Sequence, residues 1–504
     1  MGWQGDDDTR DFYYRRHRSD SADGTQFEEL VSKQKQDSEK IMGNGQFGTP
    51  EGLVYIDGSQ LSEKRFLCHR LHLAQSRGIN FLPPTAITSA FVPNSRGQVS
   101  KRYPSRVYSG QFSQDGTFFF SCTQDFKLRI FDVTDTELIQ KKEVQAFVGQ
   151  WTITDGTLSN DNKWLAYSSI TPMAFLTKSD PSDTYQFPLI FSEEDRFGIW
   201  SLRFSSTGKE LVAGTSDDSI MILDIETGRV VFRQKGHHDD VNAVCFADPS
   251  SNIIFSGSDD GLIKVWDRRS LHGEDCAAAG ALVGHTSGIT YVSAKGDGRY
   301  CLSNGKDQTM KLWDIRKLVS VDEVDPHSIC EFTNGFDYRW MDYPYMHPKV
   351  HPKDISVMTY RGHKVTSTLI RCHFSPAAST GQKYLYSGSS DGRVHIYSLN
   401  GDVVQVLDSH LAIQSSDDGR TCADAMNSKE GTLLAEAQAS SYNSRNFTSL
   451  LHSIRFQGTS RPSYIVVRDV SWHPYYPYLV TSCWVGDMGR LVKHSYTTPE
   501  SISI

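Results

Sequence analysis

The chain has 504 residues, with 52 Lys and Arg against 60 Asp and Glu and a formal net charge of −8 at pH 7. This length fits one large domain with flanking segments, and the acidic balance gives no reason to expect direct binding to nucleic acid. Nine singly scattered cysteines predict neither a disulfide framework nor a zinc module, and no apolar stretch is long enough to span a membrane.

The N-terminal part, up to residue 104, lacks the features of a folded domain. Residues 1–58 predict a disordered tail, because short acidic and basic runs alternate with polar residues. The run 43–48 (GNGQFG) has the spacing of a phosphate-binding glycine loop, but Pro50 follows where a helix should continue, so we reject a phosphate site. Residues 59–104 predict a helical docking segment and a linker, since the apolar positions of 61–77 fall at helical spacing.

Residues 105–495 alternate short apolar runs with Asp-Gly and Thr-Gly turns, a pattern typical of short antiparallel strands. Three weakly patterned units come first. Their marker residues are Ser121, Asp125 and Phe131, then the run 164–169, then Asp217, Leu223 and Asp224. We expect the segment near Val107 to pair with the last unit, because a closed ring of sheets usually has both chain ends in one sheet.

Two near copies follow, SGSDDGLIKVWDRR at 256–269 and SNGKDQTMKLWDIR at 303–316. They lie 47 residues apart, close to the roughly 40–45 residues of one propeller blade with Gly-His and Trp-Asp signatures. The spacing lets a Ser accept a hydrogen bond from the buried indole and an Asp fix the His ring. The two predicted tetrads are His237, Ser256, Asp260 and Trp266, and His285, Ser303, Asp307 and Trp313. Because the set recurs, we interpret it as structural and not as a catalytic relay.

A weaker copy comes next, with His363, Ser387 and Asp391 in the tetrad positions and Tyr397 in place of the Trp. Residues 411–462 are rich in Ser, Ala and Asn and predict a disordered insertion within the domain.

The last unit begins at 467–474 and departs from the repeat. Val485 stands where the turn Asp is expected and Leu491 where the Trp is expected, so we expect a loosely closed ring. Residues 496–504 predict a C-terminal tail.

The repeats add up to about seven. The sequence therefore predicts an all-β WD40 β-propeller of seven blades, with a disordered N-terminal extension and a short amphipathic helix. It predicts no catalytic residues, no metal and no cofactor. His347 and His351 could suggest a metal pair, but the prolines around them prevent the helix that would align the two rings.

An Arg stands two residues after the Asp of the Trp-Asp pair in both strong units. These residues are Asp267 with Arg269, and Asp314 with Arg316. Because the units are adjacent, both guanidinium groups should emerge on the same face of the propeller. Arg is enriched where protein interfaces concentrate their binding energy, so the sequence predicts a docking surface here.

A tandem Trp-Asp-x-Arg in adjacent blades resembles the docking signature of the WD-repeat substrate receptors of cullin-four RING ubiquitin ligases. The runs DDVNAV at 239–244, FDYRW at 336–340 and MTYRGH at 358–363 also resemble this family and its plant LEC-fourteen-B-like members, over about residues 105–490. The insertion at 411–462 departs from the family, which runs almost directly into the last unit.

The resemblance implies a non-enzymatic subunit that recognises substrate proteins and presents them for ubiquitination and proteasomal degradation. Its implied partners are a DDB-type adaptor, bound through Asp267, Arg269, Asp314 and Arg316, and the cullin-four RING ligase. It also implies a location in the nucleus and cytoplasm, with no direct contact to nucleic acid or membrane.

Two other hypotheses remain open at this point. One is a WD40 scaffold for another assembly, in RNA processing or chromatin, with no ligase attached. The other is an enzyme, for which the sequence offers no unique nucleophile–base pair or metal cluster. A polar constellation in the central channel is the feature that would favour an enzyme.

Overall fold

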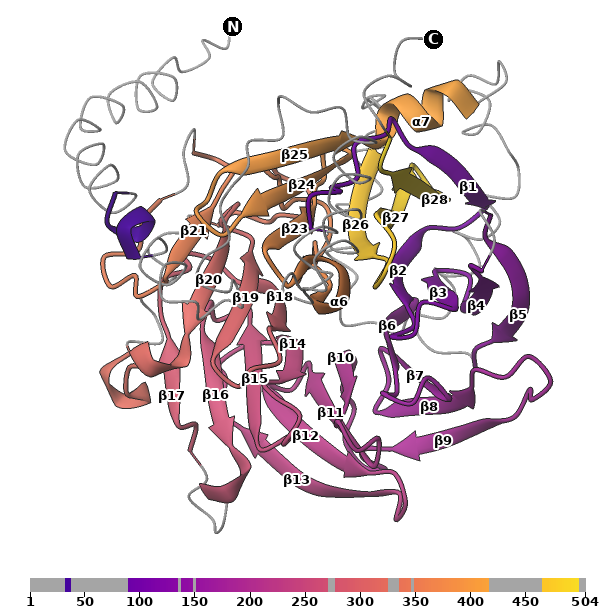
Figure 1. Ribbon diagram of the computed structural model, residues 1–504. Helices are drawn as coiled ribbons and strands as arrows, with labels where there is room; N and C mark the ends of the chain where they lie inside the picture. Colours follow the sequence, from indigo (N-terminus) through magenta and orange to yellow (C-terminus); the bar gives the residue numbers. More distant parts are fainter. Residues whose placement is uncertain are drawn as a thin grey trace, which may run out of the picture.

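Seven four-stranded antiparallel sheets surround a central channel in the computed structural model of this chain (Figure 1). The structure describes residues 32–37, 89–134, 137–147, 151–270, 277–324, 335–345, 349–416 and 465–497. This arrangement confirms the predicted seven-bladed β-propeller. No helix within these ranges is long and apolar enough to cross a membrane.

The first four blades use consecutive strands. Blade 1 contains β2 (Val107–Phe112), β3 (Phe118–Thr123), β4 (Lys127–Asp132) and β5 (Ile139–Gln145). Blade 2 contains β6 (Ile153–Leu158), β7 (Trp164–Ser169), β8 (Met173–Lys178) and β9 (Gln186–Ile190). Blade 3 contains β10 (Ile199–Phe204), β11 (Glu210–Thr215), β12 (Ser219–Asp224) and β13 (Arg229–Lys235). Blade 4 contains β14 (Val241–Phe246), β15 (Ile253–Ser258), β16 (Ile263–Asp267) and β17 (Gly280–Leu282).

The last three blades complete the ring. Blade 5 contains β18 (Ile289–Ala294), β19 (Tyr300–Gly305), β20 (Met310–Asp314) and β21 (Met358–Tyr360). Blade 6 contains β22 (Cys372–Phe374), β23 (Tyr384–Gly388), β24 (Arg393–Ser398) and β25 (Val403–Asp408). Blade 7 contains β26 (Ile465–Trp472), β27 (Tyr478–Val485), β28 (Met488–Ser495) and β1 (Gln98–Tyr103). The helical turns are η3 (Arg268–Ser270), η4 (Ile315–Lys317), η5 (Val321–Glu323), α6 (Ala377–Thr380) and α7 (Ser409–Ser416).

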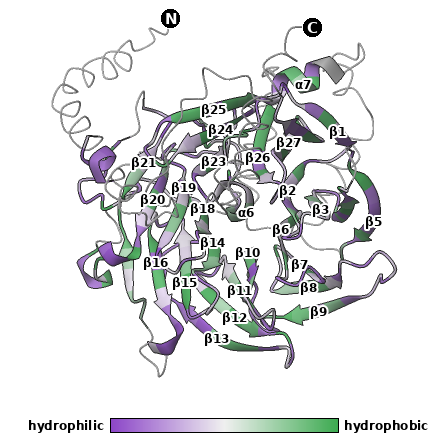
Figure 2. Cartoon of the chain, in the orientation of Figure 1, coloured by the Kyte–Doolittle hydropathy of each residue, from purple (hydrophilic) through white to green (hydrophobic). Residues whose placement is uncertain are grey.

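Burial differs between the inner and outer strands of a blade. The inner strand β14 is buried along most of its length, and β13 at the outside of its neighbour alternates between exposed and half-buried residues. Outer strands also carry apolar residues (Figure 2), and among them Phe187 of β9 and Val403 of β25 are exposed. The core therefore lies between the blades, where neighbouring sheets pack face to face and their apolar side chains form shared clusters.

Ring closure uses an earlier segment than the sequence predicted. β1 pairs antiparallel with β28, so the fourth strand of blade 7 comes from the N-terminal side of the domain. The expectation that the segment near Val107 closes the ring is wrong, because Val107 begins β2 of blade 1. The propeller accordingly begins before residue 105, within the range assigned to a linker.

The expectation of a loosely closed last blade is also wrong. β27 and β28 pair from Tyr478 with Ser495 through to Val485 with Met488. Leu491, in the position of the missing Trp, is fully buried in an apolar cluster shared with blade 1. Backbone pairing and apolar packing close this blade without the tetrad residues.

Two segments predicted as disordered are partly helical. Residues 32–37 form a helical turn beside β21 (Figure 1), and Gln34 is buried there, donating to Ser356 Oγ at 3.0 Å and Thr359 Oγ1 at 3.1 Å. α7 covers the first residues of the predicted insertion at 411–462. The remainder of that insertion and the predicted helix at 61–77 lie outside the described residues.

The antiparallel sheets give the propeller two faces. In every blade, the connections after the first and third strands lie at one end of the sheet, and those after the second and fourth strands lie at the other. Asp267 and Asp314 end the third strands of blades 4 and 5, so we name their side the Asp-Arg face. The other side is the opposite face.

Candidate functional site

The structure brings the residues of each predicted tetrad together. His237 Nδ1 lies 2.8 Å from Asp260 Oδ2 and its Nε2 lies 2.7 Å from Ser256 Oγ, which also accepts from Trp266 Nε1 at 2.8 Å. The pKa of Asp260 falls to about 2 despite its burial, because His237 attracts and hydrogen-bonds the carboxylate. All four side chains are buried, so this tetrad ties the strands of blade 4 together and offers no open reaction site.

Blade 5 repeats this geometry. His285 lies 2.9 Å from Asp307 and 2.7 Å from Ser303, and Trp313 Nε1 donates to Ser303 at 2.7 Å. His285 holds the pKa of Asp307 well below its usual range against the effect of burial. The repetition supports a structural role.

The weaker copy in blade 6 departs from the predicted tetrad. His363 contacts Tyr397 OH at 3.1 Å and Asn304 Oδ1 of blade 5 at 2.7 Å, in place of Ser387 and Asp391. Burial, with a further contribution from His395, lowers the pKa of His363 to about 3, and the charge of Asp307 offsets only part of this effect. The Tyr in the Trp position offers its hydroxyl to the imidazole, which changes the partners of the whole set.

Trp266→Phe should lower the free energy of unfolding by about 2 kcal/mol, because it removes the indole hydrogen bond and leaves a small void. Ser256 keeps His237 as a partner, so no buried polar atom is left alone. Urea denaturation followed by circular dichroism measures the change. Trp340→Phe is the matched control, since Trp340 is 62% exposed and should change stability little.

The first Asp-Arg pair forms where β16 ends. Arg269 donates from Nε to Asp267 Oδ1 at 2.9 Å and from Nη2 to Oδ2 at 2.7 Å, and the Arg269 backbone N–H also reaches Oδ1. These hydrogen bonds lower the pKa of Asp267. The side chain of Arg269 remains 68% exposed, so its orientation is fixed while its outer edge stays available to a partner.

The second pair has the same form at the end of β20. Arg316 donates from Nε and Nη2 to the Asp314 carboxylate at 3.1 and 2.7 Å, and its side chain is 62% exposed. Asp314 Oδ2 also accepts a hydrogen bond from Arg299 Nη2 at 2.9 Å. Burial raises the pKa of Asp314 even so. Both Arg side chains therefore lie on the Asp-Arg face of neighbouring blades, held by the Asp two residues earlier.

Arg268, beside the first pair, has a different role that the sequence did not separate from it. Its Nη1 and Nη2 each lie 2.7 Å from the Glu210 carboxylate at the start of β11. This bidentate contact ties blade 4 to blade 3. Of the two consecutive arginines, only Arg269 extends away from the fold.

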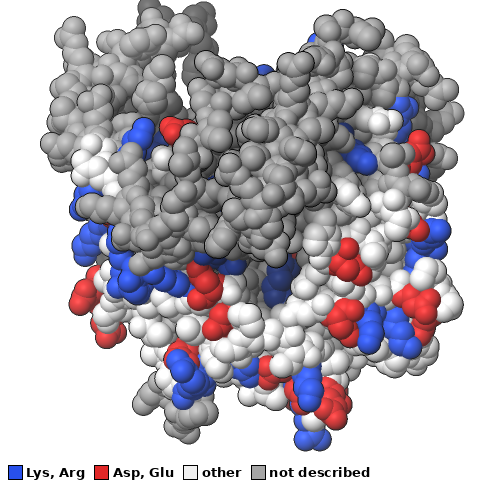
Figure 3. Space-filling model, viewed as in Figure 1, with Lys and Arg blue, Asp and Glu red and all other residues white. Residues whose placement is uncertain are grey.

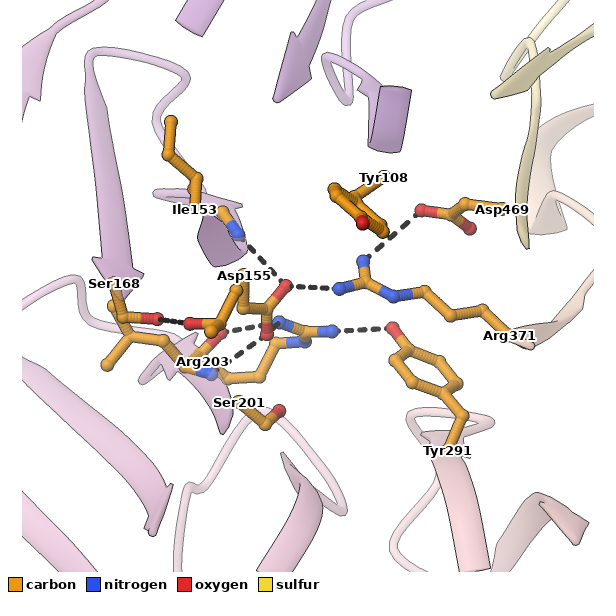
Figure 4. Close-up of polar contacts among 12 residues, drawn as sticks. Tyr108, Ile153, Asp155, Ser168, Ser201, Arg203, Tyr291, Arg371 and Asp469 are labelled. Atoms are coloured by element: carbon orange, nitrogen blue, oxygen red, sulfur yellow. Dashed lines mark hydrogen bonds and ion pairs between the residues drawn. The ribbon is translucent and has the colours of Figure 1, made fainter. Parts of the chain in front are cut away.

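The central channel holds a buried ionic network that the sequence did not reveal (Figure 4). Asp155 of β6 lies at its centre and accepts from Arg203 of β10 at 2.5 Å and from Arg371 at 2.7 Å. Arg371 also donates to Asp469 of β26 at 3.2 Å, and Arg203 donates to Tyr291 OH. These contacts connect blades 2, 3, 5, 6 and 7 across the channel.

Acidic and basic side chains also lie next to one another around the outer rim of the propeller (Figure 3).

This network is the polar constellation that would favour an enzyme, and its charged groups pair with one another. Asp469 accepts from His373 at 2.9 Å, from the Gly110 and Val470 backbone N–H groups and from Arg371, so both of its oxygens are occupied. Among the described residues, no hydroxyl or thiol is hydrogen-bonded to His373. A cavity of about 320 Å³ extends from this network toward the Asp-Arg face.

Three carboxylates gather on the opposite face between blades 3 and 4. Asp218, Asp239 and Asp240 have oxygen atoms within 4.8 Å of one another. Burial, followed by the charges of Asp259 and Asp239, raises the pKa of Asp240 to about 6, and Trp200 Nε1 donates to it at 3.2 Å. We name Asp218, Asp239 and Asp240 the acidic group. Carboxylate sets of this kind occur often without a metal ion, and no metal is assigned to it.

Asp240→Asn should stabilise the protein at about pH 7 and raise Tm by about 1–3 °C. The folded protein takes up a proton at Asp240 below about pH 6, but the unfolded chain does so only near its usual value of 3.8. The contribution of this carboxyl to stability therefore falls as pH rises through that window. The difference in Tm between Asp240→Asn and the wild type should be smaller at about pH 4.5 than at pH 7. Asp322→Asn, at an exposed position, should leave Tm unchanged at both pH values.

Comparison with known proteins places these features in a family context. The WD40 family model (WD domain, G-beta repeat) matches residues 97–132, 189–224, 228–267, 278–314 and 355–398. The chain is 41% identical to the LEC14B protein of Lithospermum erythrorhizon over 424 residues, which are 81% of this chain and 77% of that protein. It is 41% identical to a LEC14B homolog of Prunus armeniaca over 77% of this chain and 72% of that protein.

A further relative carries an informative name. The chain is 34% identical to the "DDB1- and CUL4-associated factor 11 homolog" of Caenorhabditis elegans over 356 residues, which are 67% of this chain and 62% of that protein. These matches confirm the family resemblance that the repeated motifs indicated.

Proposed function

The chain belongs to the LEC14B group of WD40-repeat proteins, and from this membership and its Asp-Arg face we propose that it is a substrate-recognition subunit of a CUL4 ubiquitin ligase. In this role the Asp-Arg face binds the adaptor DDB1, and the opposite face presents a protein for ubiquitination and degradation. The protein itself carries out no chemistry. It works in the nucleus and cytoplasm.

The observation that carries this proposal is the pair of exposed arginines on neighbouring blades. Each guanidinium is held by the Asp two residues earlier, so little side-chain freedom is lost when a partner binds. Arg268 shows the contrast, because its guanidinium is engaged by Glu210 within the fold. An Arg that is oriented and still exposed is suited to a protein interface.

Purification of the tagged full chain from cells, with partners identified by mass spectrometry, tests this proposal. DDB1 and CUL4 should accompany the protein, and purified DDB1 should bind it directly in a reconstituted mixture. If neither the cell extract nor the purified proteins give a complex, the ligase role is wrong and the scaffold hypothesis replaces it.

A further inference from the structure

The connection between the third and fourth strands of blade 5 reaches both faces of the propeller. It leaves β20 on the Asp-Arg face and returns to β21, which starts on the same face. Residues 335–345 of this connection lie instead on the opposite face, where Ser367 N donates to Tyr338 O at 2.7 Å. We name residues 335–345 the Trp340 turn. An ordinary blade needs only a few residues for this connection, so the excursion adds residues 335–345 to the opposite face.

Side-chain contacts with the propeller and within the turn hold the Trp340 turn in place. Lys306, in the connection after β19, lies 4.2 Å from the Tyr338 ring, and the same ammonium pairs with Asp259 at 2.6 Å. Tyr338 is half-buried, and burial raises the pKa of its hydroxyl. Phe336 packs edge-on against Tyr343, with 5.4 Å between ring centroids.

Two large apolar side chains nevertheless extend from this turn into solvent. Trp340 is 62% exposed and Met341 is 48% exposed. The backbone N–H groups of both residues donate to Asp337 O, at 3.2 and 2.9 Å, so the turn presents them from an ordered backbone. Trp side chains are enriched at the centres of protein interfaces, and an exposed Trp on an ordered backbone is suited to such a contact.

The carboxylates of the acidic group lie near this turn on the opposite face. Lys306, which contacts the Tyr338 ring of the Trp340 turn, pairs with Asp259, and the Asp259 backbone N–H donates to Asp240 O of the acidic group at 2.9 Å. Arg339 is balanced by Asp337 at 3.5 Å, and Asp259 by Lys306. The acidic group has no ion pair of its own among the described residues, although the charges of Lys235 and His237 act on Asp218. Its charge is thus available to a partner.

We propose that the Trp340 turn and the acidic group together bind a protein segment that carries Lys or Arg beside a large apolar side chain. This inference rests on the proposed function and specifies the class of substrate that the opposite face recognises. The apolar side chain packs on Trp340 and Met341, and the cation is placed against Asp239 and Asp240. Charge complementarity selects this occupant, because an acidic segment would meet repulsion there.

Random peptides displayed on phage and selected on the immobilised full chain provide the probe. The enriched peptides should carry Lys or Arg close to a large apolar residue. Synthetic versions should bind the Trp340→Ala/Met341→Ala variant at least about tenfold more weakly than the wild type, as measured by fluorescence polarisation. Asp239→Asn/Asp240→Asn should weaken binding as well and should reduce its dependence on salt.

Tyr185→Ala is the matched control, since Tyr185 is 63% exposed on another part of the surface, and it should leave peptide binding unchanged. Circular dichroism shows whether each variant is folded. Enriched peptides that lack basic residues, that bind the variants as tightly as the wild type, or that are displaced by self-association of the chain would overturn the proposal.

The outcome is separable from that of the proposed function. The Trp340→Ala/Met341→Ala variant should still bind DDB1, and a variant of the Asp-Arg face should still bind the peptides. Peptide binding without DDB1 binding in the wild type supports this surface and rejects the ligase role. DDB1 binding together with unselective peptides supports the ligase role and rejects this surface.

Discussion

The Arg269→Ala/Arg316→Ala double variant should fold normally and lose DDB1. Both side chains are mostly exposed and each pairs with the Asp at its own strand end, so we expect neither to support the core. At the interface, the loss of two central arginines should weaken DDB1 binding by at least about a hundredfold. Co-purification of DDB1 should then fall to background, and titration of purified DDB1 in a biosensor should give the size of the change.

Arg339→Ala is the matched control for this experiment. Arg339 is 63% exposed, follows an Asp by two residues and pairs with it at 3.5 Å, but it lies on the opposite face. It should leave DDB1 binding unchanged. If the double variant is folded and binds DDB1 as tightly as the wild type, the Asp-Arg face is not the docking surface.

The repeat pattern carries most of the information about the fold. Trp266 and Trp313, each ten residues after a Ser and six after an Asp, predict strands, turns and blade count, because the tetrad requires that spacing. The same pattern locates Arg269 and Arg316 at strand ends. These features are local, so they can be read along the chain.

Other features depend on residues far apart in the sequence. β1 closes the ring without any motif, because a fourth strand needs only a free edge and a fitting apolar face. The sequence likewise gives no signal that residues 335–345 cross to the opposite face, since Tyr338 meets Lys306 only in the folded ring. The partners of His363 changed for the same reason, because Asn304 comes from another blade.

The channel network is the clearest case of this limit and leads to a large expected effect on stability. Asp155, Arg371 and Asp469 belong to blades 2, 6 and 7 and meet only across the channel. Burial also lowers the pKa of Arg468 to about 10, with Arg371 adding to the effect. Among these residues, the channel thus holds more guanidinium groups than carboxylates. Loss of either carboxylate should therefore leave buried positive charge without a partner.

Asp155→Ala should lower the free energy of unfolding by about 3–5 kcal/mol, because it leaves Arg203 and Arg371 as buried cations without their shared anion. Asp155 is fully buried, and Arg203 and Arg371 face the cavity described above, so the size of the loss reports how well water can replace the carboxylate. The Asp155→Ala/Arg371→Met double variant should lose less than the sum of the two single variants, since it removes one of the unpaired charges. Urea denaturation of all three variants measures this coupling. A loss below about 1 kcal/mol in Asp155→Ala would mean that water enters the channel and that the blades are held by their apolar packing alone.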